Sequence, residues 1–203
     1  MNIKTLPLTK STFRQKGLEA REKLSRSQIE EKNRKITQHL TTLPEIKNSS
    51  EIFCYLSSDE KKEAGTNQFI SWALEQNKNI YVPRSNWRKK TLTLHKLPAF
   101  PPDKKYFDEK YGIPEPKEDY NLQSDLSKLE IVILPGTAGD LKGARYGLKA
   151  GFYDRFLERL SKTNKTFIPV LILFEEQIFP QIPREEHDFP VKIIVTEKKI
   201  YRI

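Results

Sequence analysis

Five short apolar segments constrain the fold of this 203-residue chain more than any other feature. They are continuous runs of aliphatic and aromatic residues, without the alternation of apolar and polar residues that is typical of a strand with one solvent-exposed face. Such runs predict strands that are buried on both faces, as in a parallel sheet covered by helices. The predicted strands span residues 51–56, 79–83, 130–134, 168–174 and 191–196.

Patterns of helical spacing lie before and between these strands. The predicted helices span residues 9–24, 27–42, 66–77 and 152–161. Ser27 and Thr66 are the expected N-caps, and Glu30 completes a capping box with Ser27. Segment 92–97 alternates and predicts an edge strand, whereas 98–128 is rich in Pro, Asp and Lys and is expected to be mostly loop.

Composition narrows the class of protein. Hydrophobic residues make up 36% of the chain and charged residues 31%, which indicates a globular protein with a highly charged surface. No apolar run approaches the ~20 residues that a membrane helix needs, so no membrane partner is expected. Cys54 is the only cysteine, which excludes an internal disulfide and is typical of a cytoplasmic protein. Since no repeat or linker divides the chain, we expect one three-layer α/β domain over residues 1–203, with a mainly parallel central sheet.

The net charge of +9 is concentrated near the N-terminus. Residues 1–36 carry ten Lys or Arg and four Glu, which is +6 of the total. A basic surface favours anionic partners such as phosphates, polyglutamates or nucleic acid, although it can also serve solubility alone.

A glycine-rich stretch follows the predicted strand 130–134. Five of the eight glycines lie within sixteen residues, at positions 136, 139, 143, 147 and 151, and helix 152–161 comes next. In an open α/β sheet, ligands bind beyond the carboxyl ends of the strands, where a loop without side chains and a helix N-terminus can hold phosphate oxygens. Arg145 can add a two-pronged phosphate contact, and Asp154 can hold Mg²⁺. The stretch therefore predicts a phosphate site.

Several motifs of the chain resemble one known family. Residues 135–157 contain "PG…G…R-x-G-x-x-x-G-F-Y-D-R-F-L", which resembles the signature of 5-formyltetrahydrofolate cyclo-ligases, also called 5,10-methenyltetrahydrofolate synthetases. "KSTFR" (10–14), "YGIPEP" (111–116) and "HDFPVKIIVTE" (187–197) are similar to other segments of the family, in the same order. The resemblance covers nearly the whole chain. It implies a fold similar to the NagB/RpiA/CoA-transferase-like fold.

The resemblance also implies an activity, ATP- and Mg²⁺-dependent closure of 5-formyltetrahydrofolate to 5,10-methenyltetrahydrofolate. Lys10, Arg145 and Asp154 would be the catalytic residues. Asp154 and Asp188 would bind Mg²⁺. The residues expected to bind ATP are Lys10, Arg14, Gly143, Arg145, Gly147, Lys149, Gly151 and Tyr153. The residues expected to bind the folate are Leu56, Glu63, Tyr111, Phe152 and Tyr153, with Glu60 as the alternative to Glu63.

Two other functions stay open on the sequence alone. Lys149 and Ala150 replace residues usual in the family, so a diverged member that binds nucleotide or folate with little turnover is one alternative. A basic nucleic-acid-binding protein is the other, although no aromatic RNA-binding motif supports it. We expect a monomer whose partners are ATP and the folate. The positive charge within residues 4–35 further predicts that a polyglutamate tail on the folate increases its affinity.

Overall fold

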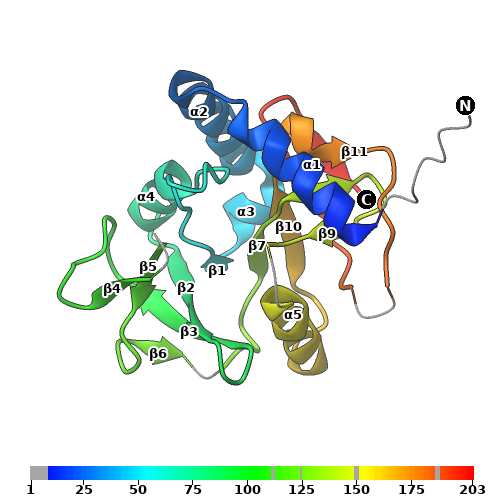
Figure 1. Ribbon diagram of the computed structural model, residues 1–203. Helices are drawn as coiled ribbons and strands as arrows, with labels where there is room; N and C mark the ends of the chain where they lie inside the picture. The colour runs from blue at the N-terminus through cyan, green and yellow to red at the C-terminus, as the bar shows by residue number, and fades with distance from the viewer. Residues whose placement is uncertain (1–8, 111–112, 124, 149–150, 186–187) are drawn as a thin grey trace, which may run out of the picture.

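The central element of the fold is an eight-stranded sheet (Figure 1). The computed structural model describes residues 9–110, 113–123, 125–148, 151–185 and 188–203. The strand order is β13-β12-β10-β7-β1-β2-β3-β6. From the first to the last of these, the strands are Ile200–Arg202, Ile193–Val195, Ile168–Ile172, Ile131–Pro135, Glu51–Cys54, Asn79–Asn86, Thr91–Leu97 and Leu122–Gln123.

The five predicted strands form the parallel centre of this sheet, β12-β10-β7-β1-β2. β13 and β3 pair antiparallel with the two outer strands of this centre, and β6 pairs antiparallel with β3. The predicted mainly parallel sheet is therefore confirmed. Segment 92–97 forms β3 as expected, but it is not the edge strand, because the two-residue β6 pairs outside it.

Helices cover both faces of the sheet, which gives the predicted three layers. The helices are α1 (Lys10–Glu22), α2 (Arg26–Thr42), α3 (Pro44–Asn48), α4 (Asn67–Glu75) and α5 (Phe152–Thr163). Successive residues of β1 point to opposite faces: Ile52 belongs to the core cluster of α2, α3 and α4, and Phe53 belongs to the cluster of α5. Phe53 stacks on Phe156 of α5 with ring centroids 5.0 Å apart.

α1 packs on a separate small sheet rather than on the central one. This sheet has the order β11-β8-β9, and its strands are Ile178–Phe179, Ala138–Asp140 and Arg145–Tyr146. Phe13 of α1 packs with Ala138, Ala144 and Tyr146 in a third core cluster. The glycine-rich stretch is thus not only a loop: it also contains short strands against which α1 packs.

Several local predictions were wrong. The N-cap of α2 is Ser25, not Ser27, because the Ser25 hydroxyl accepts from the Gln28 backbone and the Gln28 side chain accepts from the Ser25 backbone. Segment 98–128 is mostly loop, as predicted, but three strands within it were missed: β6 and the hairpin of β4 (Phe107–Lys110) and β5 (Ile113–Pro116). Frequent Pro and Lys concealed this hairpin, since both are depleted in strands. Helix α3 and the short 3₁₀ helix Glu175–Gln177 were also missed.

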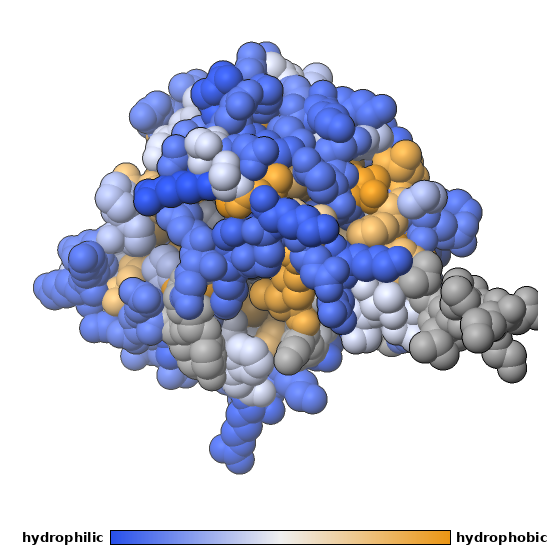
Figure 2. Space-filling model, turned by 45° about the horizontal axis from the view of Figure 1, so that its top comes forward, coloured by the Kyte–Doolittle hydropathy of each residue, from blue (hydrophilic) through white to orange (hydrophobic). Residues whose placement is uncertain are grey.

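The topology places a crevice next to β1. β1 and β7 are neighbours, and the chain continues in the sheet from β1 to β2 on one side and from β7 to β10 on the other, so the two connections run in opposite directions. Ligands of open α/β sheets bind at such a point, beyond the carboxyl ends of the strands. The surface is largely hydrophilic, with separate hydrophobic patches between polar side chains (Figure 2). Among the described residues, no helix has the length and apolar character to cross a membrane.

Candidate active site

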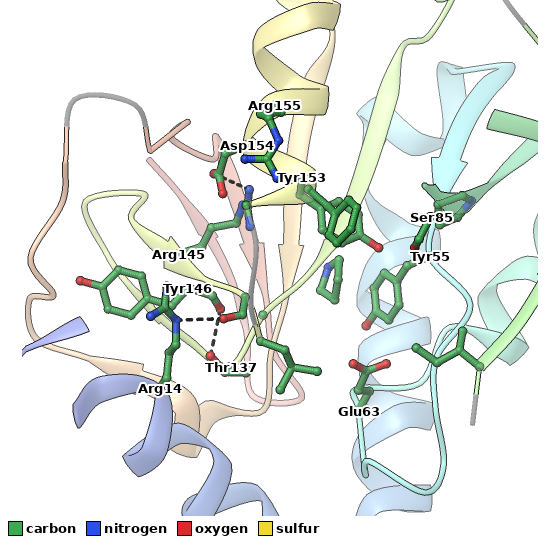
Figure 3. Close-up of a pocket in the computed structure, with 18 of the residues that line it drawn as sticks. Arg14, Tyr55, Glu63, Ser85, Thr137, Arg145, Tyr146, Tyr153, Asp154 and Arg155 are labelled. Carbon is green, nitrogen blue, oxygen red and sulfur yellow. Dashed lines mark hydrogen bonds and ion pairs between the residues drawn. The ribbon is translucent and has the colours of Figure 1, made fainter. Parts of the chain in front are cut away.

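A cavity of about 900 Å³ lies at this crevice. Its walls come from the residues that follow β1 and β7, from the end of β2, from β5, from α1 and from the first turns of α5. Figure 3 shows Arg14, Arg145 and Asp154 on one side, Tyr55, Glu63 and Ser85 on the other, and Tyr153 between them. We call these sides the cationic half, where the basic side chains Lys10, Arg14 and Arg145 lie with the carboxylates Asp154, Glu185 and Asp188, and the acidic half, where Glu63 and Glu115 lie with one lysine, Lys61.

Arg145 is the most buried charge of the cationic half. Its side chain is 2% exposed, and its Nη2 donates to Asp154 Oδ1 at 2.7 Å. The Nε of Arg145 has no hydrogen-bond partner among the described residues. Burial lowers the pKa of Arg145, while the negative charges of Asp154 and Asp188 act in the opposite direction. Both aspartates therefore lie within electrostatic range of one guanidinium, although they are 34 positions apart in the chain.

Lys10 and Arg14 reach the same half from α1. Lys10 Nζ contacts Asp188 Oδ2 at 2.6 Å and Glu185 Oε2 at 3.1 Å. Arg14 lies one turn further along the helix, so its side chain points the same way. Arg14 Nε donates to the Gly147 carbonyl at 3.1 Å, and its guanidinium lies over the Tyr146 ring at 5.3 Å. Both cations face the cavity, as predicted.

The glycines of the stretch lie at different places relative to the cavity, and they differ in whether the structure requires a glycine there. Gly151 has φ = 59° and is the N-cap of α5, so the first N–H groups of that helix open toward the cavity. A side chain at Gly147 would meet no atom within 4 Å, so the wall there is open. Gly136 also lines the cavity. Gly143 does not, because it forms the turn between β8 and β9, where it has φ = 83°. Gly143 was predicted to bind ATP, but the structure places it in this turn and not in the wall of the cavity.

Glu63 and two tyrosines form the floor of the acidic half. Glu63 Oε2 accepts from the Ser58 backbone at 3.1 Å, and burial raises the pKa of its carboxyl. Burial also raises the pKa of both Tyr55 and Tyr153, with the negative charge of Glu63 as a further cause. The Tyr55 hydroxyl donates to the Ala64 carbonyl and so holds the Glu63 loop beside β1. Both phenols therefore stay protonated across the ordinary pH range.

The β2 and β5 wall of this half was missed by the sequence analysis. Pro83, Ser85 and Trp87 alternate along β2 and just beyond it, so all three face the cavity. Glu115 of β5 accepts from the Ser85 backbone at 3.2 Å through Oε1, and its Oε2 has no partner among the described residues. The two-residue spacing in "PRSNW" is a signal that could have located the row.

Comparison with known proteins agrees with the motifs of the glycine-rich stretch. Residues 8–197 match the 5-formyltetrahydrofolate cyclo-ligase family. The chain belongs to this family. It is 34% identical to the 5-formyltetrahydrofolate cyclo-ligase of Haemophilus influenzae over 173 residues, which cover 84% of this chain and 88% of that protein. It is 28% identical to the cyclo-ligase of Mus musculus over 187 residues, covering 91% of this chain and 88% of the relative.

Comparison with solved structures also finds members of this family. The 5,10-methenyltetrahydrofolate synthetase of Aquifex aeolicus superposes with a TM-score of 0.76 at 28% identity, covering 95% of this chain and 92% of that one. The synthetase of Mycoplasma pneumoniae, with a TM-score of 0.71 at 16% identity, supports the fold alone. The predicted fold class and family are thus confirmed, and the nucleic-acid alternative gains no support.

With the cyclo-ligase family established, the predicted site residues can be placed. The following line the cavity: Lys10, Arg14, Leu56, Glu63, Arg145, Gly147, Gly151, Phe152, Tyr153, Asp154 and Asp188. Between the two alternatives for the folate contact, Glu63 lines the cavity, whereas Glu60 is exposed and does not. Tyr111 and Lys149 lie outside the described residues.

The two aspartates fit a Mg²⁺ ion that arrives with ATP. Within the described part of the chain, no group of three or more His, Cys, Asp or Glu side chains is arranged to hold a metal. Mg²⁺ does not need such a group, because it prefers one or two carboxylates together with phosphate oxygens and water. Asp154 and Asp188 would be those carboxylates, since each contacts one of the cations Arg145 and Lys10 at the cavity wall.

Proposed function

We propose that the chain catalyses the ATP- and Mg²⁺-dependent cyclisation of 5-formyltetrahydrofolate to 5,10-methenyltetrahydrofolate, with release of ADP and phosphate. The observation that supports this most is the division of one cavity into a cationic half at a helix N-terminus and an acidic half with aromatic walls. A polyphosphate and an N–H-rich heterocycle need opposite surroundings, and this cavity offers both side by side.

The chemistry explains why both substrates must share one cavity. The formyl oxygen of the amide is a poor leaving group. Transfer of the γ-phosphoryl group to that oxygen makes it a phosphate ester, and N10 of the same folate then attacks the formyl carbon. The C–O bond breaks, phosphate leaves, N10 loses its proton, and the five-membered ring is closed. Phosphoryl transfer of this kind depends mainly on positioning and on stabilisation of charge.

The residues divide this work. Lys10, Arg14 and Arg145 bind the phosphates, and the N-terminal N–H groups of α5 add donors at the same place. Asp154 and Asp188 hold Mg²⁺, which neutralises phosphate charge when bound. Glu63 accepts hydrogen bonds from the folate, and Tyr153, between the two halves, lies beside the formyl group. A monomeric, cytoplasmic enzyme stays a prediction, which size-exclusion chromatography and fractionation test.

An absorbance assay for 5,10-methenyltetrahydrofolate tests the function directly. We expect product from 5-formyltetrahydrofolate when ATP and Mg²⁺ are present and none when either is withheld. The absence of product under complete conditions would instead support the diverged member with little turnover. Glu63→Gln and Glu60→Gln form a matched pair, since only the first residue lines the cavity. We expect the KM for the folate to rise about tenfold in the first, for a lost charge-assisted hydrogen bond, and to stay unchanged in the second.

A further inference from the structure

Trp87 has an unusual position for a large apolar side chain. It is 48% exposed, and it is one of six exposed large hydrophobic residues in the described chain. It lies in the turn after β2 and lines the rim of the cavity. Its ring meets Phe152, the first residue of α5, edge to face at 5.0 Å and 80°. The indole therefore packs on α5 at the mouth of the site, with much of its surface still in water.

The row on β2 places Trp87 in the acidic half. Pro83 and Ser85 precede it at two-residue spacing, and the Ser85 backbone is bonded to Glu115. The cations Lys10, Arg14 and Arg145 and the N-terminus of α5 all lie in the other half, so the chain of phosphates that leads to adenosine belongs there. The folate consequently takes the acidic half. Its reacting pterin lies deep, near Glu63, and the remainder of the molecule extends toward the mouth.

We propose that Trp87 is a specificity-determining residue, whose indole packs against the aminobenzoyl ring of the folate. This inference rests on the proposed function. The aminobenzoyl ring follows N10 and precedes the glutamate, so it occupies the stretch between the deep pterin and bulk water. Trp87 offers a flat aromatic surface at that depth. Packing buries both rings and uses the geometry that aromatic pairs prefer.

The chain offers a matched control for this role. It has two tryptophans. Trp72 packs beside Phe69 of α4, with ring centroids 5.9 Å apart, and does not line the cavity. The Trp72→Phe variant therefore leaves Trp87 as the only tryptophan, and 5-fluorotryptophan incorporated there gives one ¹⁹F signal at the rim.

Two measurements test the proposal. In the fluorinated Trp72→Phe protein, 5-formyltetrahydrofolate alone should shift the ¹⁹F signal, and a non-hydrolysable ATP analogue with Mg²⁺ should not. In kinetics, Trp87→Ala should raise the KM for the folate about tenfold, Trp87→Phe should raise it less, and the KM for ATP should change less than about twofold in both. The Tm of each variant checks that it is folded.

Specific outcomes would overturn the proposal. A shift with the ATP analogue and none with the folate would assign Trp87 to adenine. A folate titration that saturates by calorimetry without moving the ¹⁹F signal would remove Trp87 from the folate site. Both readouts need binding but no turnover, so they separate a failure of this inference from a failure of the proposed activity.

Discussion

At the scale of single residues, two of the three proposed phosphate-binding cations are already paired with a proposed metal ligand. Lys10 pairs with Asp188 at 2.6 Å, and Arg145 pairs with Asp154 at 2.7 Å. On the proposed function, both partners would exchange when ATP binds with Mg²⁺, since the carboxylates would hold the ion and the cations would contact phosphate. ATP alone would meet the same carboxylates without the ion. We therefore expect the pairs to favour the metal complex of the nucleotide over metal-free ATP.

If this exchange occurs, Asp188→Asn should have opposite effects on the affinity for metal-free ATP and on Mg²⁺-dependent turnover. Asp188→Asn removes a negative charge beside Lys10, so metal-free ATP should bind at least about threefold more tightly, by calorimetry with chelator present. The same change should lower Mg²⁺-dependent turnover. Asp125→Asn is the control, because it removes the same charge at the end of the sheet remote from the cavity. Weaker binding of metal-free ATP to the Asp188 variant would contradict the exchange.

Glu63 predicts a conflict between stability and function. Burial raises its pKa in the folded protein above the ordinary value of 4.5. Between these two values the folded state binds more protons than the unfolded state, so the free energy of unfolding falls as the pH rises through that window. Glu63→Gln removes the buried charge. Its Tm should exceed that of the wild type at pH 8, and the difference should vanish below pH 4.5, while the KM for the folate rises. A lower Tm at pH 8 would mean that the carboxylate stabilises the fold.

At the scale of elements, the position of α1 depends on one glycine. A Cβ on Gly17 would lie 1.8 Å from the Thr137 carbonyl oxygen, so only glycine lets the helix approach β8 this closely. Lys10 and Arg14 stand on the same helix, and Thr137 lines the cavity. The contact therefore sets the distance between the phosphate-binding cations and the rest of the site.

Gly17→Ala should consequently destabilise the protein, although Gly→Ala within a helix normally stabilises it by about 0.5–1 kcal/mol. Overpacking of about 1–3 kcal/mol should lower the Tm by several degrees and raise the KM for ATP more than that for the folate. Ser11→Ala, at an exposed position of α1, is the control and should leave both KM values unchanged. An increase of Tm in the Gly17 variant would show that α1 does not need this contact.

The elements also show what the sequence could predict. The five central strands were found because continuous apolar runs have one stable environment, a sheet covered on both faces. Arg145 and Asp154 were found from their place in the glycine-rich stretch after a buried strand, whereas Lys10 and Asp188, far away in the sequence, came only from the resemblance. Trp87 and Glu115 were missed because their place in the cavity depends on how the β4–β5 hairpin packs against β2 and how α5 lies beside the β2–β3 turn, which are long-range properties. Gly143 was misplaced because glycine spacing does not separate a phosphate loop from a tight turn.

At the scale of the whole molecule, α1 and α2 carry many of the basic residues near the N-terminus, but a second basic group lies closer to the proposed folate site. Arg88, Lys89 and Lys90 follow Trp87 in the β2–β3 turn, and all three are exposed. Arg155 of α5 lines the cavity and donates to the Lys90 carbonyl at 2.8 Å. A folate whose benzoyl ring contacts Trp87 directs its glutamate toward this turn. A polyglutamate tail would therefore meet these residues first.

Two triple variants that remove equal charge distinguish this turn from the N-terminal helices. With the wild type, polyglutamylated folate should bind more tightly than the monoglutamate, and the gain should shrink as salt rises from ~0.05 to ~0.5 M, because salt screens exposed charges. Arg88→Gln, Lys89→Gln and Lys90→Gln together should abolish most of the gain at low salt. Lys16→Gln, Lys23→Gln and Arg26→Gln together, at exposed positions of α1, α2 and the turn between them, should reduce it only slightly. Equal losses in the two variants would instead indicate long-range steering by the net charge, whereas no gain in the wild type would leave the basic surface without a role in folate binding.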